Sequence, residues 1–281
     1  MRESIKVFAP ATVANVGCGY DVLGFALEGY GDELILTRRP DDRLVIASIE
    51  GVQGLPLDPL KNVSTAAINA LLTDLDLKQG FDLRIKKNIA AGSGLGSSAS
   101  SAAAAVYAAN EILGRPKSQL ELINYAMAGE KLASTKAHAD NVAPSILGGF
   151  TAVRSYEPLD VFNISYPESL KVVVIFPQIE IKTSDAKKIL RDEVKLTDAV
   201  KQWGNMAGLI SGLIEHDFER IGKSLQDVIV EPVRSILIPF YHQMKTLALE
   251  KGALGFSISG SGPSMFLSLI HISEPTRRRG I

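Results

Sequence analysis

The 281-residue chain lacks the residues that several classes of protein require. Cys18 is the only cysteine, which excludes a disulfide scaffold within the chain and a zinc site built from several cysteines. No hydrophobic run reaches the length that spans a bilayer, and the N-terminus, Met1-Arg2-Glu3-Ser4-Ile5-Lys6, has no apolar signal core. We therefore expect a cytoplasmic protein.

The chain also lacks an excess of charge of either sign. Its 30 basic and 31 acidic residues are mixed along the sequence, and the net charge is −1. No basic stripe indicates nucleic-acid binding, and no polybasic segment indicates a membrane surface. The length and the 46% hydrophobic content allow one large or two ordinary domains with substantial cores.

The most informative feature that is present is a run of glycine and serine. It reads Ile89-Ala90-Ala91-Gly92-Ser93-Gly94-Leu95-Gly96-Ser97-Ser98-Ala99 and leads into the alanine-rich run 100–109. Glycine weakens helix and strand interiors, so three glycines at alternate positions predict a loop. The serines and alanines predict a helix that begins with hydroxyl caps. A glycine loop before a helix N-terminus offers N–H groups and the positive end of the helix dipole, which predicts a site for a nucleotide polyphosphate.

The two commonest phosphate loops do not fit this run. The P-loop needs a lysine after Gly96, and the dinucleotide fingerprint needs a third glycine, but Ser97 occupies both positions. The alternative interpretation is a glycine-rich turn before a buried alanine helix. A seven-residue Gly-Ser-Gly-Leu-Gly-Ser-Ser loop costs conformational entropy on folding, and this favours a ligand site over a plain turn.

Hydrophobic periodicity predicts the main elements. In the first part we expect strands at 5–8, 33–38, 44–49, 81–86 and 150–154, and helices at 62–72 and 118–133. The polar stretch 156–169 contains two prolines and suggests a domain junction. Beyond it we expect strands at 171–176, 255–259 and 264–270, and helices around 185–190, 198–215 and 236–251. The mixed order of strands and helices predicts an α+β fold with two domains.

The end of the chain differs from the rest, because it has no periodicity and carries three consecutive arginines. We interpret residues 268–281 as a non-native tail that looks like translated adapter sequence on a truncated chain, with a disordered basic tail as the alternative. The predicted domains are then residues 1–165, with the phosphate loop, and residues 166–267.

Four segments in order resemble a known family. Residues 10–24, which include Asn15-Val16-Gly17-Cys18-Gly19-Tyr20-Asp21, the glycine–serine loop, and 252–264, which include Ser259-Gly260-Ser261-Gly262-Pro263, resemble the three motifs of the GHMP small-molecule kinases. Residues 138–149, His-Ala-Asp-Asn-Val-Ala-Pro-Ser-Ile-Leu-Gly-Gly, resemble the signature that homoserine kinases carry within that superfamily. The resemblance covers essentially all of the chain up to residue 267.

This resemblance implies a fold and an activity. The fold would be the two-domain α+β GHMP kinase fold, with a first domain like domain 2 of ribosomal protein S5 and a ferredoxin-like second domain. The activity would be phosphorylation of the side-chain hydroxyl of L-homoserine by ATP with Mg²⁺, a step of threonine biosynthesis. Another GHMP kinase and a non-catalytic nucleotide-binding homologue are the alternatives, and a homodimer is compatible with the family.

The resemblance also implies a set of site residues. Ser98 and Glu130 would hold the magnesium ion. The nucleotide would contact Asn62, Ile89, Ala90, Ala91, Gly92, Ser93, Gly94, Leu95, Gly96, Ser97, Ser98 and Ala99. The substrate would contact Asn15, Asp21, His138, Asp140, Thr183, Lys187, Arg234 and Gly260, with the acidic side chains near the ammonium and Arg234 and Lys187 near the carboxylate.

Three positions depart from the family pattern. Ala90 and Cys18 stand where proline is common, and Lys187 stands where arginine is usual. Lysine keeps the charge but lacks the planar fork that grips a carboxylate through two hydrogen bonds. Cys18 is interpreted as a small apolar filler.

The catalytic base is an open question in the sequence. Many members of the superfamily have an aspartate seven residues before the Gly-Gly pair, but here that residue is Asn141, which cannot take a proton. We expect catalysis by positioning and electrostatic stabilisation, with Asn141, Glu130 and Ser98 as the catalytic residues. The proton would leave to a phosphate oxygen or water. The rival hypothesis is that Asp140 acts as the base.

Overall fold

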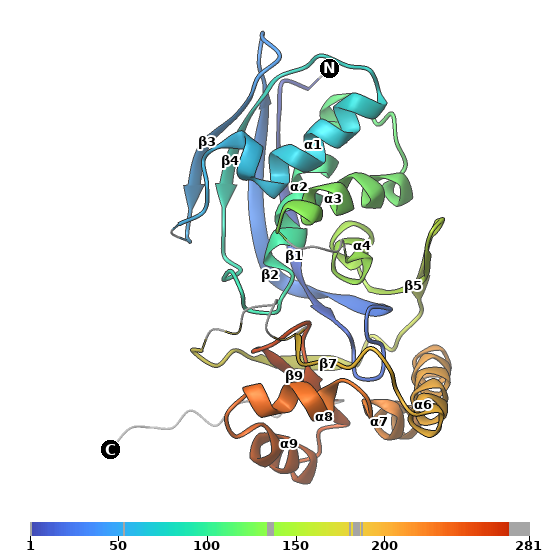
Figure 1. The fold of residues 1–281 in the computed structure, drawn as a ribbon. Coiled ribbons are helices and arrows are strands. Elements are labelled where there is room, and N and C mark those ends of the chain that lie inside the picture. The colour runs from blue at the N-terminus through green and yellow to red at the C-terminus, as the bar shows by residue number, and fades with distance from the viewer. Residues whose placement is uncertain are drawn as a thin grey trace.

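A computed structural model describes residues 2–52, 54–133, 138–179, 181, 186, 188–269. Two predicted substrate contacts, Thr183 and Lys187, lie outside the described residues. Figure 1 shows two stacked domains, and the chain crosses from the upper to the lower one between residues 164 and 171.

The first domain is built on a six-stranded sheet. Its strands are β1 (Ser4–Ala14), β2 (Leu23–Arg38), β3 (Leu44–Glu50), β4 (Phe81–Lys86), β5 (Phe150–Tyr156) and β6 (Leu159–Ile164). The strand order is β3-β4-β2-β5-β6, and β1 also pairs with β2. Only β3 and β4 are parallel, because the chain crosses over through a helix between them. The long strand β2 pairs with β5 near its start and with β4 near its end.

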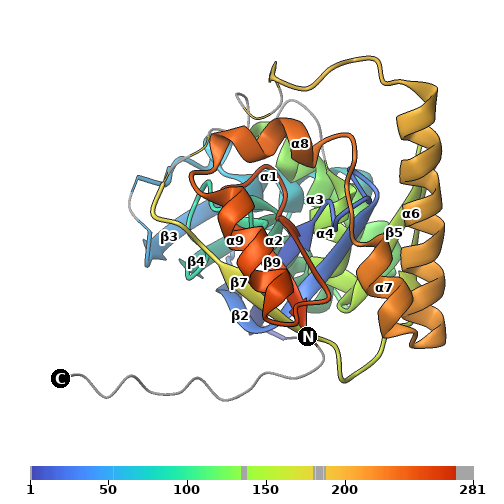
Figure 2. The same ribbon diagram turned by 90° about the horizontal axis from the view of Figure 1, so that it is seen from below.

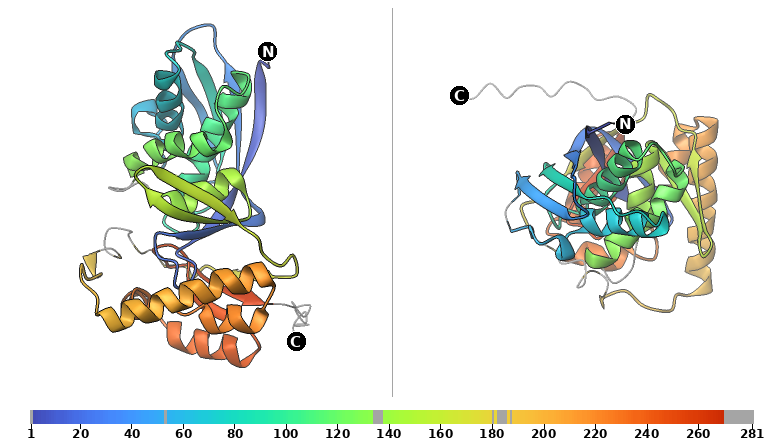
Figure 3. Two further views of the ribbon diagram at one scale, coloured as in Figure 1. Left: turned by 90° about the vertical axis from the view of Figure 1, so that its right-hand side faces the viewer. Right: turned by 90° about the horizontal axis from the view of Figure 1, so that it is seen from above.

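Helices cover one face of this sheet (Figure 1; Figure 3, left). They are α1 (Val63–Asp74), α2 (Ser97–Ile112), α3 (Gln119–Ala133) and α4 (Ala139–Leu147), with a short 3₁₀ turn η1 (Pro59–Lys61) before α1. Helix α2 lies at the centre, and its alanines from Ala102 to Ala105 are all buried. Such small side chains let α1, α3, α4 and the strands β1 and β2 pack closely around α2, which therefore fixes the position of the loop that precedes it.

The second domain has a three-stranded antiparallel sheet in the order β7-β9-β8. Its strands are β7 (Lys171–Ile175), β8 (Gly255–Ile258) and β9 (Met265–Leu269). The helices are α6 (Leu196–Glu215), α7 (Phe218–Ser224), α8 (Glu231–Arg234) and α9 (Tyr241–Glu250), with the 3₁₀ turn η2 (Ser235–Leu237) after α8. The predicted α+β class with two domains is confirmed, and Figure 2 shows the second domain from below.

Each domain has a hydrophobic core of its own, and a third cluster spans both domains. Phe25 of β2 stacks on Phe150 of β5 at 5.5 Å between ring centroids, and Phe266 of β9 meets Phe25 edge-on at 5.8 Å. Leu209 of α6 and Ile221 of α7 are buried in the same cluster. The domains are thus held together by apolar packing, and the same cluster includes Val16 and Leu95 of the motif segments.

Some elements differ from the sequence expectations. The segment 156–169 contains β6, which pairs with β5 in the first sheet. The expected helix 236–251 is divided, since Pro239 lies between η2 and α9 and Phe240 adopts a left-handed backbone with φ 61°. Ser268 and Leu269, the first residues of the expected tail, are the last residues of β9, and residues 270–281 lie outside the described residues.

Within the part of the chain that the structure describes, no helix combines the length and the apolar content needed to cross a bilayer.

Candidate active site

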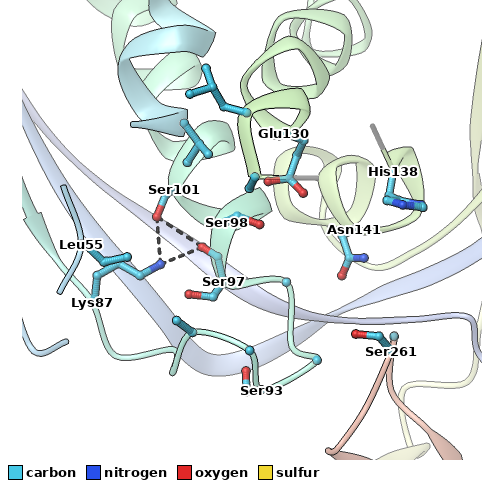
Figure 4. A pocket seen from close by; sticks show the side chains of 18 of the residues that line it. Leu55, Lys87, Ser93, Ser97, Ser98, Ser101, Glu130, His138, Asn141 and Ser261 are labelled. Atoms are coloured by element: carbon cyan, nitrogen blue, oxygen red, sulfur yellow. Dashed lines mark hydrogen bonds between the residues drawn. The ribbon is translucent and has the colours of Figure 1, made fainter. Parts of the chain in front are cut away.

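A cavity of about 430 Å³ lies where the motif segments of both domains meet (Figure 4). Of the predicted site residues, those lining it are Asn15, Asp21, Asn62, Ala91, Gly92, Ser93, Gly94, Gly96, Ser97, Ser98, Glu130, His138, Asp140, Asn141, Arg234 and Gly260. Ala90 is not among the lining residues, and Ile89, Leu95 and Ala99 are buried in the core. The side chains of Ile89, Leu95 and Ala99 anchor the loop to the hydrophobic core.

The glycines of the loop are required by conformation and by close approach. Gly92, Gly94 and Gly96 have φ values of 71°, 80° and 68°, which side chains other than glycine rarely adopt. A Cβ atom on Gly94 would lie 2.6 Å from the carbonyl oxygen of Ser259, and one on Gly96 would lie 2.1 Å from Thr12 Oγ1. The loop is therefore in backbone contact with the second domain and with β1.

The start of α2 differs from the expected serine-capped helix. Its N-cap is Gly96, and no side chain caps the helix. The Ser97 hydroxyl instead donates a hydrogen bond of 2.9 Å to the carbonyl of Ile89. The prediction of a hydroxyl cap is wrong. Gly96, Ser97 and Ser98 at this uncapped helix start line the cavity, where an anionic group of a ligand can accept from free N–H groups.

Glu130 is the strongest indication of a cation site. It lies near the end of α3, is buried, and its Oε1 atom has no hydrogen-bond partner among the described residues. Burial raises the pKa of Glu130, while Ser98 and the charges of His138 and Lys87 act in the opposite direction. Figure 4 shows Ser98 and Glu130 next to each other at the same side of the cavity. An unpartnered carboxylate oxygen beside a hydroxyl fits a hard cation such as Mg²⁺.

Two motif segments that line the cavity are joined by hydrogen bonds. Asn15 Nδ2 donates to the carbonyl of Gly260 at 2.8 Å, and its Oδ1 accepts from the backbone N–H of Asp21 at 2.9 Å. The Asp21 carboxylate lies 3.3 Å from His138 Nδ1. Asn15 thus links the domains and fixes the turn that presents Asp21.

Asp140, in the first turn of α4, is buried beside this group. Its Oδ1 atom lacks a hydrogen-bond partner within the described part of the chain. Burial raises the pKa of Asp140 to about 7; His138 lowers it and Asp21 raises it further. The arrangement provides a carboxylate that becomes charged near neutral pH and has an oxygen atom free for a cationic ligand.

Arg234, at the end of α8, places a buried cation in the same region. It donates to the carbonyls of Gly260 at 2.9 Å and Ala186 at 3.2 Å, and its guanidinium lies 5.2 Å from the centroid of the Tyr20 ring. None of these described partners is a carboxylate. Since a buried charge is normally paired with the opposite charge, Arg234 is suited to an anionic group of a ligand.

Asn141 lies between the phosphate loop and β1. Its Oδ1 accepts a hydrogen bond of 2.8 Å from Thr12 Oγ1, and a Cβ atom on Gly96 would lie 2.9 Å from the same oxygen. Asn141 is therefore held against the loop in the lining of the cavity that also contains Glu130 and Arg234.

Sequence reasoning missed several lining residues, and the polar ones among them are Tyr20, Lys61, Lys87, Ser101 and Ser261. Lys87 follows β4, where a lysine is ordinarily solvated, and only the structure shows that it is buried. Tyr20 precedes Asp21 in a motif segment, which is the one signal that could have identified it. Cys18 is buried and its pKa is raised by burial to about 12, so the thiol is unreactive, as expected of an apolar filler.

Comparison with known proteins identifies the family. The chain matches the family models "GHMP kinases N terminal domain" over residues 62–149 and "GHMP kinases C terminal" over residues 209–268. The fold and the glycine-loop site thus define a GHMP kinase. The Leishmania major mevalonate kinase structure, at 15% identity and a TM-score of 0.71, shares this fold.

More similar relatives narrow the identification. Homoserine kinase of Chloroherpeton thalassium is 47% identical over 275 residues, which cover 94% of this chain and 86% of the relative. That of Pyrococcus furiosus is 42% identical, covering 93% and 87%. The crystal structure of homoserine kinase from Cytophaga hutchinsonii has a TM-score of 0.92 at 50% identity and covers 95% of this chain and 85% of that one. The chain belongs to the homoserine kinase family of the GHMP kinases.

Proposed function

We propose that the chain transfers the γ-phosphoryl group of ATP to the side-chain hydroxyl of L-homoserine, giving O-phospho-L-homoserine for threonine biosynthesis. The observation that carries the proposal is the pairing of opposite unsatisfied charges in one cavity. Buried Arg234 has no carboxylate partner among the described residues, and buried Asp140 has a free carboxylate oxygen. A small zwitterion with a carboxylate and an ammonium group satisfies both.

The glycine loop and the uncapped N-terminus of α2 would bind the triphosphate. The lining residues Asn62 and Lys61, with apolar Ile49, Leu55 and Pro56, would enclose the rest of the nucleotide. Ser98 and Glu130 would hold Mg²⁺, which neutralises charge on the β- and γ-phosphates when bound. No group of three or more His, Cys, Asp or Glu side chains in the described ranges could hold a metal alone, so the remaining ligands would be phosphate oxygens and water.

The substrate would lie across the cavity from Arg234 to Asp140. Arg234 would bind its carboxylate, and Lys187 and Thr183 would add to that end. Asp140 and Asp21, with His138, would bind its ammonium group. The side-chain hydroxyl would then point towards Asn141 and the phosphate loop.

Asn141 would orient the hydroxyl through a hydrogen bond, with no side chain taking the proton before transfer. Its amide is fixed by Thr12, so it can hold the attacking oxygen in line with the γ-phosphate. The loop N–H groups would stabilise the charge that spreads over the phosphoryl oxygens. The proton would leave to a phosphate oxygen or to water. Asp140 would be a binding residue, while its use as a base is the rival hypothesis.

The decisive experiment is a coupled ADP-release assay with L-homoserine, mevalonate and galactose as acceptors. Turnover with homoserine alone is expected. Turnover with mevalonate or galactose would assign the chain to another GHMP activity, and ATP binding without turnover on any acceptor would favour a non-catalytic homologue. The free oxygen of Glu130 argues against the non-catalytic alternative, because such a homologue has no use for a buried unpaired carboxylate.

We further propose a domain boundary between residues 165 and 166, with the second domain extending through β9 to Leu269. The boundary is supported by the change of sheet between β6, which ends at Ile164, and β7, which begins at Lys171. A cytoplasmic location is proposed because the reaction needs ATP.

A further inference from the structure

Gln202 of α6 is not among the residues that line the cavity, yet its side chain connects two segments that carry proposed substrate contacts. The side chain is buried. Its Nε2 atom donates to the carbonyl of Cys18 at 3.0 Å and to the Asp227 carboxylate at 2.9 Å, and its Oε1 atom accepts from the backbone N–H of Val228 at 3.0 Å. One amide side chain therefore joins α6 to the first domain and to the segment that leads into α8.

Asp227 fixes the start of α8. It lies between α7 and α8, in a segment that runs back alongside α6 (Figure 2). Its Oδ1 atom accepts from the N–H groups of Ile229 and Val230 at 2.9 Å each, and its Oδ2 atom accepts from the N–H of Glu231 at 2.8 Å. Arg234 is the last residue of the four-residue helix that begins there. A single helical turn has little stability of its own, so the position of Arg234 depends on this anchored start.

The carbonyl of Cys18 belongs to the motif turn that presents Asp21. Within this turn the N–H of Gly19 donates to the carbonyl of Val16 at 3.1 Å, and the N–H of Asp21 donates to Asn15. Cys18 lies between these bonds and is buried. A displacement of its carbonyl is therefore passed on to Asp21 through a closed turn.

The cavity itself holds another link between the same two segments. The carbonyl of Gly260 accepts from Asn15 at 2.8 Å and from Arg234 at 2.9 Å. One point of attachment fixes a distance but leaves the two segments free to rotate about it. The bonds of Gln202 supply a second point away from the cavity, and two points fix distance and orientation together.

We propose, on the basis of the proposed function, that Gln202 is a positioning residue for the amino-acid substrate. Through Cys18 and Asp227 it fixes the separation between Asp21, which would bind the ammonium group, and Arg234, which would bind the carboxylate. In an α-amino acid both groups are attached to one carbon atom, so their separation is constant. A site that holds its two charges at one matching separation binds such a substrate without a cost for rearrangement.

Gln202→Leu tests the link, because leucine is close to glutamine in size and makes none of the three hydrogen bonds. We expect the KM for homoserine to rise about tenfold, while the KM for ATP changes by less than about twofold. The matched control is Asn205→Leu on the same helix. It removes a hydrogen bond of 2.8 Å from the Asn205 amide to the carbonyl of Gln226, and it leaves the bonds to Cys18 and Asp227 in place. The homoserine KM of this control should equal that of the parent.

A double-mutant cycle with Arg234→Ala separates positioning from a general effect on the fold. If Gln202 acts by placing Arg234 relative to the ammonium site, adding Gln202→Leu to Arg234→Ala should leave the homoserine KM nearly unchanged. A purely structural role would lower the melting temperature and the active fraction of the enzyme and leave both KM values as in the parent. Effects that multiply in the double variant, or an unchanged homoserine KM in Gln202→Leu, overturn the proposal.

Asp227→Asn keeps the cycle decisive if Gln202→Leu does not fold. Asparagine retains one oxygen for the neighbouring N–H groups and loses the acceptor of Glu231, so the homoserine KM should rise about threefold, again without a further rise in the Arg234→Ala background. An unchanged homoserine KM in Asp227→Asn contradicts the proposal. Failure of the proposed function is recognised separately, because the parent protein itself would then release no ADP with homoserine.

Discussion

Lys87 and Asp32 form an ion pair in which both side chains are buried. The pair ties together both ends of the phosphate loop. Asp32 accepts from the backbone N–H groups of Asn88 and Ile89, and Lys87 donates to the carbonyl of Ser97 at 2.7 Å and to Ser101 Oγ at 2.8 Å (Figure 4). The loop is thus anchored to β2 before its first glycine and after its last one.

Loss of this anchor should affect nucleotide binding. Lys87→Met leaves Asp32 buried without its cation, so we expect the free energy of unfolding to fall by roughly 3–5 kcal/mol. In the Lys87→Met protein that remains folded, the KM for ATP should rise about tenfold while the KM for homoserine changes little. The control is Lys86→Met. Lys86 is exposed, and its ion pair with Glu33 is long, with 3.7 Å between the charged atoms. Equal KM values for ATP in both variants would show that the pair does not shape the loop.

Glu130→Gln should separate catalysis from stability. The substitution removes the carboxylate proposed to hold magnesium, so turnover should fall about a hundredfold or more and the Mg²⁺ concentration at half-maximal rate should rise. Stability without magnesium should hold or increase, because burial raises the pKa of Glu130 and its charged form is therefore disfavoured in the fold. Magnesium titrations and thermal melts measure the two effects, with exposed Glu250→Gln as control. Ser98→Ala should act in the same direction, and near-normal turnover in both site variants would remove the magnesium assignment.

Arg234→Ala should weaken homoserine binding. A hydrogen bond to a charged group contributes roughly 1.5–3 kcal/mol, so the KM for homoserine should rise about ten- to a hundredfold. The KM for homoserine of Arg234→Lys should lie between those of the parent and of Arg234→Ala, since lysine keeps the charge and loses the planar fork. Lys187→Arg is expected to hold or lower the same KM. The KM for ATP serves as the internal reference, and an unchanged homoserine KM in Arg234→Ala would mean that the carboxylate binds elsewhere.

Asn141 tests the base-free mechanism. Asn141→Ala should reduce turnover about ten- to a hundredfold through loss of orientation. Asn141→Asp should not increase it, because a new anion next to the γ-phosphate adds repulsion where transition-state charge accumulates. Single-turnover rates at saturating ATP and homoserine measure both. A faster Asn141→Asp enzyme would show that a carboxylate base at this position helps the reaction.

Asp140 should make homoserine binding depend on pH. Its pKa of about 7 means that the carboxylate becomes charged as the pH rises from 6 to 8, so kcat/KM for homoserine should increase over this range. Asp140→Asn should abolish that dependence and raise KM. If single-turnover chemistry collapses while homoserine affinity is retained, Asp140 is the base and the base-free mechanism fails.

The Asp140 carboxylate also makes the stability of the fold depend on pH, but stability falls as the pH rises. The folded-state pKa of Asp140 is raised above the unfolded value, so the folded state holds more protons between about pH 4 and 7 and stability falls as the pH rises through that range. Asp140→Asn removes this cost, which is largest above the folded-state pKa. The variant should therefore melt higher than the parent at pH 8 and close to it at pH 4. Equal melting temperatures at pH 8 would show that the carboxylate is not charged in the fold.

The sequence predicted the regular elements best where the hydrophobic pattern is uninterrupted. Strand β4 was expected at 81–86 and lies there, and the helix start at Asn62 is the N-cap of α1. The first half of β2 and the end of β1 were missed, because the glycines of β2 and the alanines and proline of β1 are uncommon in strands. These segments are strands owing to long-range pairing between β1 and β2, which a local pattern does not contain.

The candidate site was predicted through motifs and not through residue types. Asp140 and Glu130 are ordinary acidic residues in the sequence, and only the fold shows that they are buried with a free oxygen. Lys87 belongs to no motif, and its partner Asp32 lies 55 residues away. A contact over that distance depends on the register of β2 and β4, which no periodicity reveals.

The contact of Gly94 with Ser259 has a consequence for the order in which the protein is made. The Ser259 hydroxyl donates to the Gly94 carbonyl at 2.7 Å across 165 positions of the chain. During synthesis the first domain emerges and can form its core well before Ser259 leaves the ribosome. The phosphate loop then reaches its final shape only when the β8–β9 turn packs against it. The first domain of a nascent chain should therefore fold before the chain can bind nucleotide. Nucleotide binding should begin once the last two strands, β8 and β9, have formed.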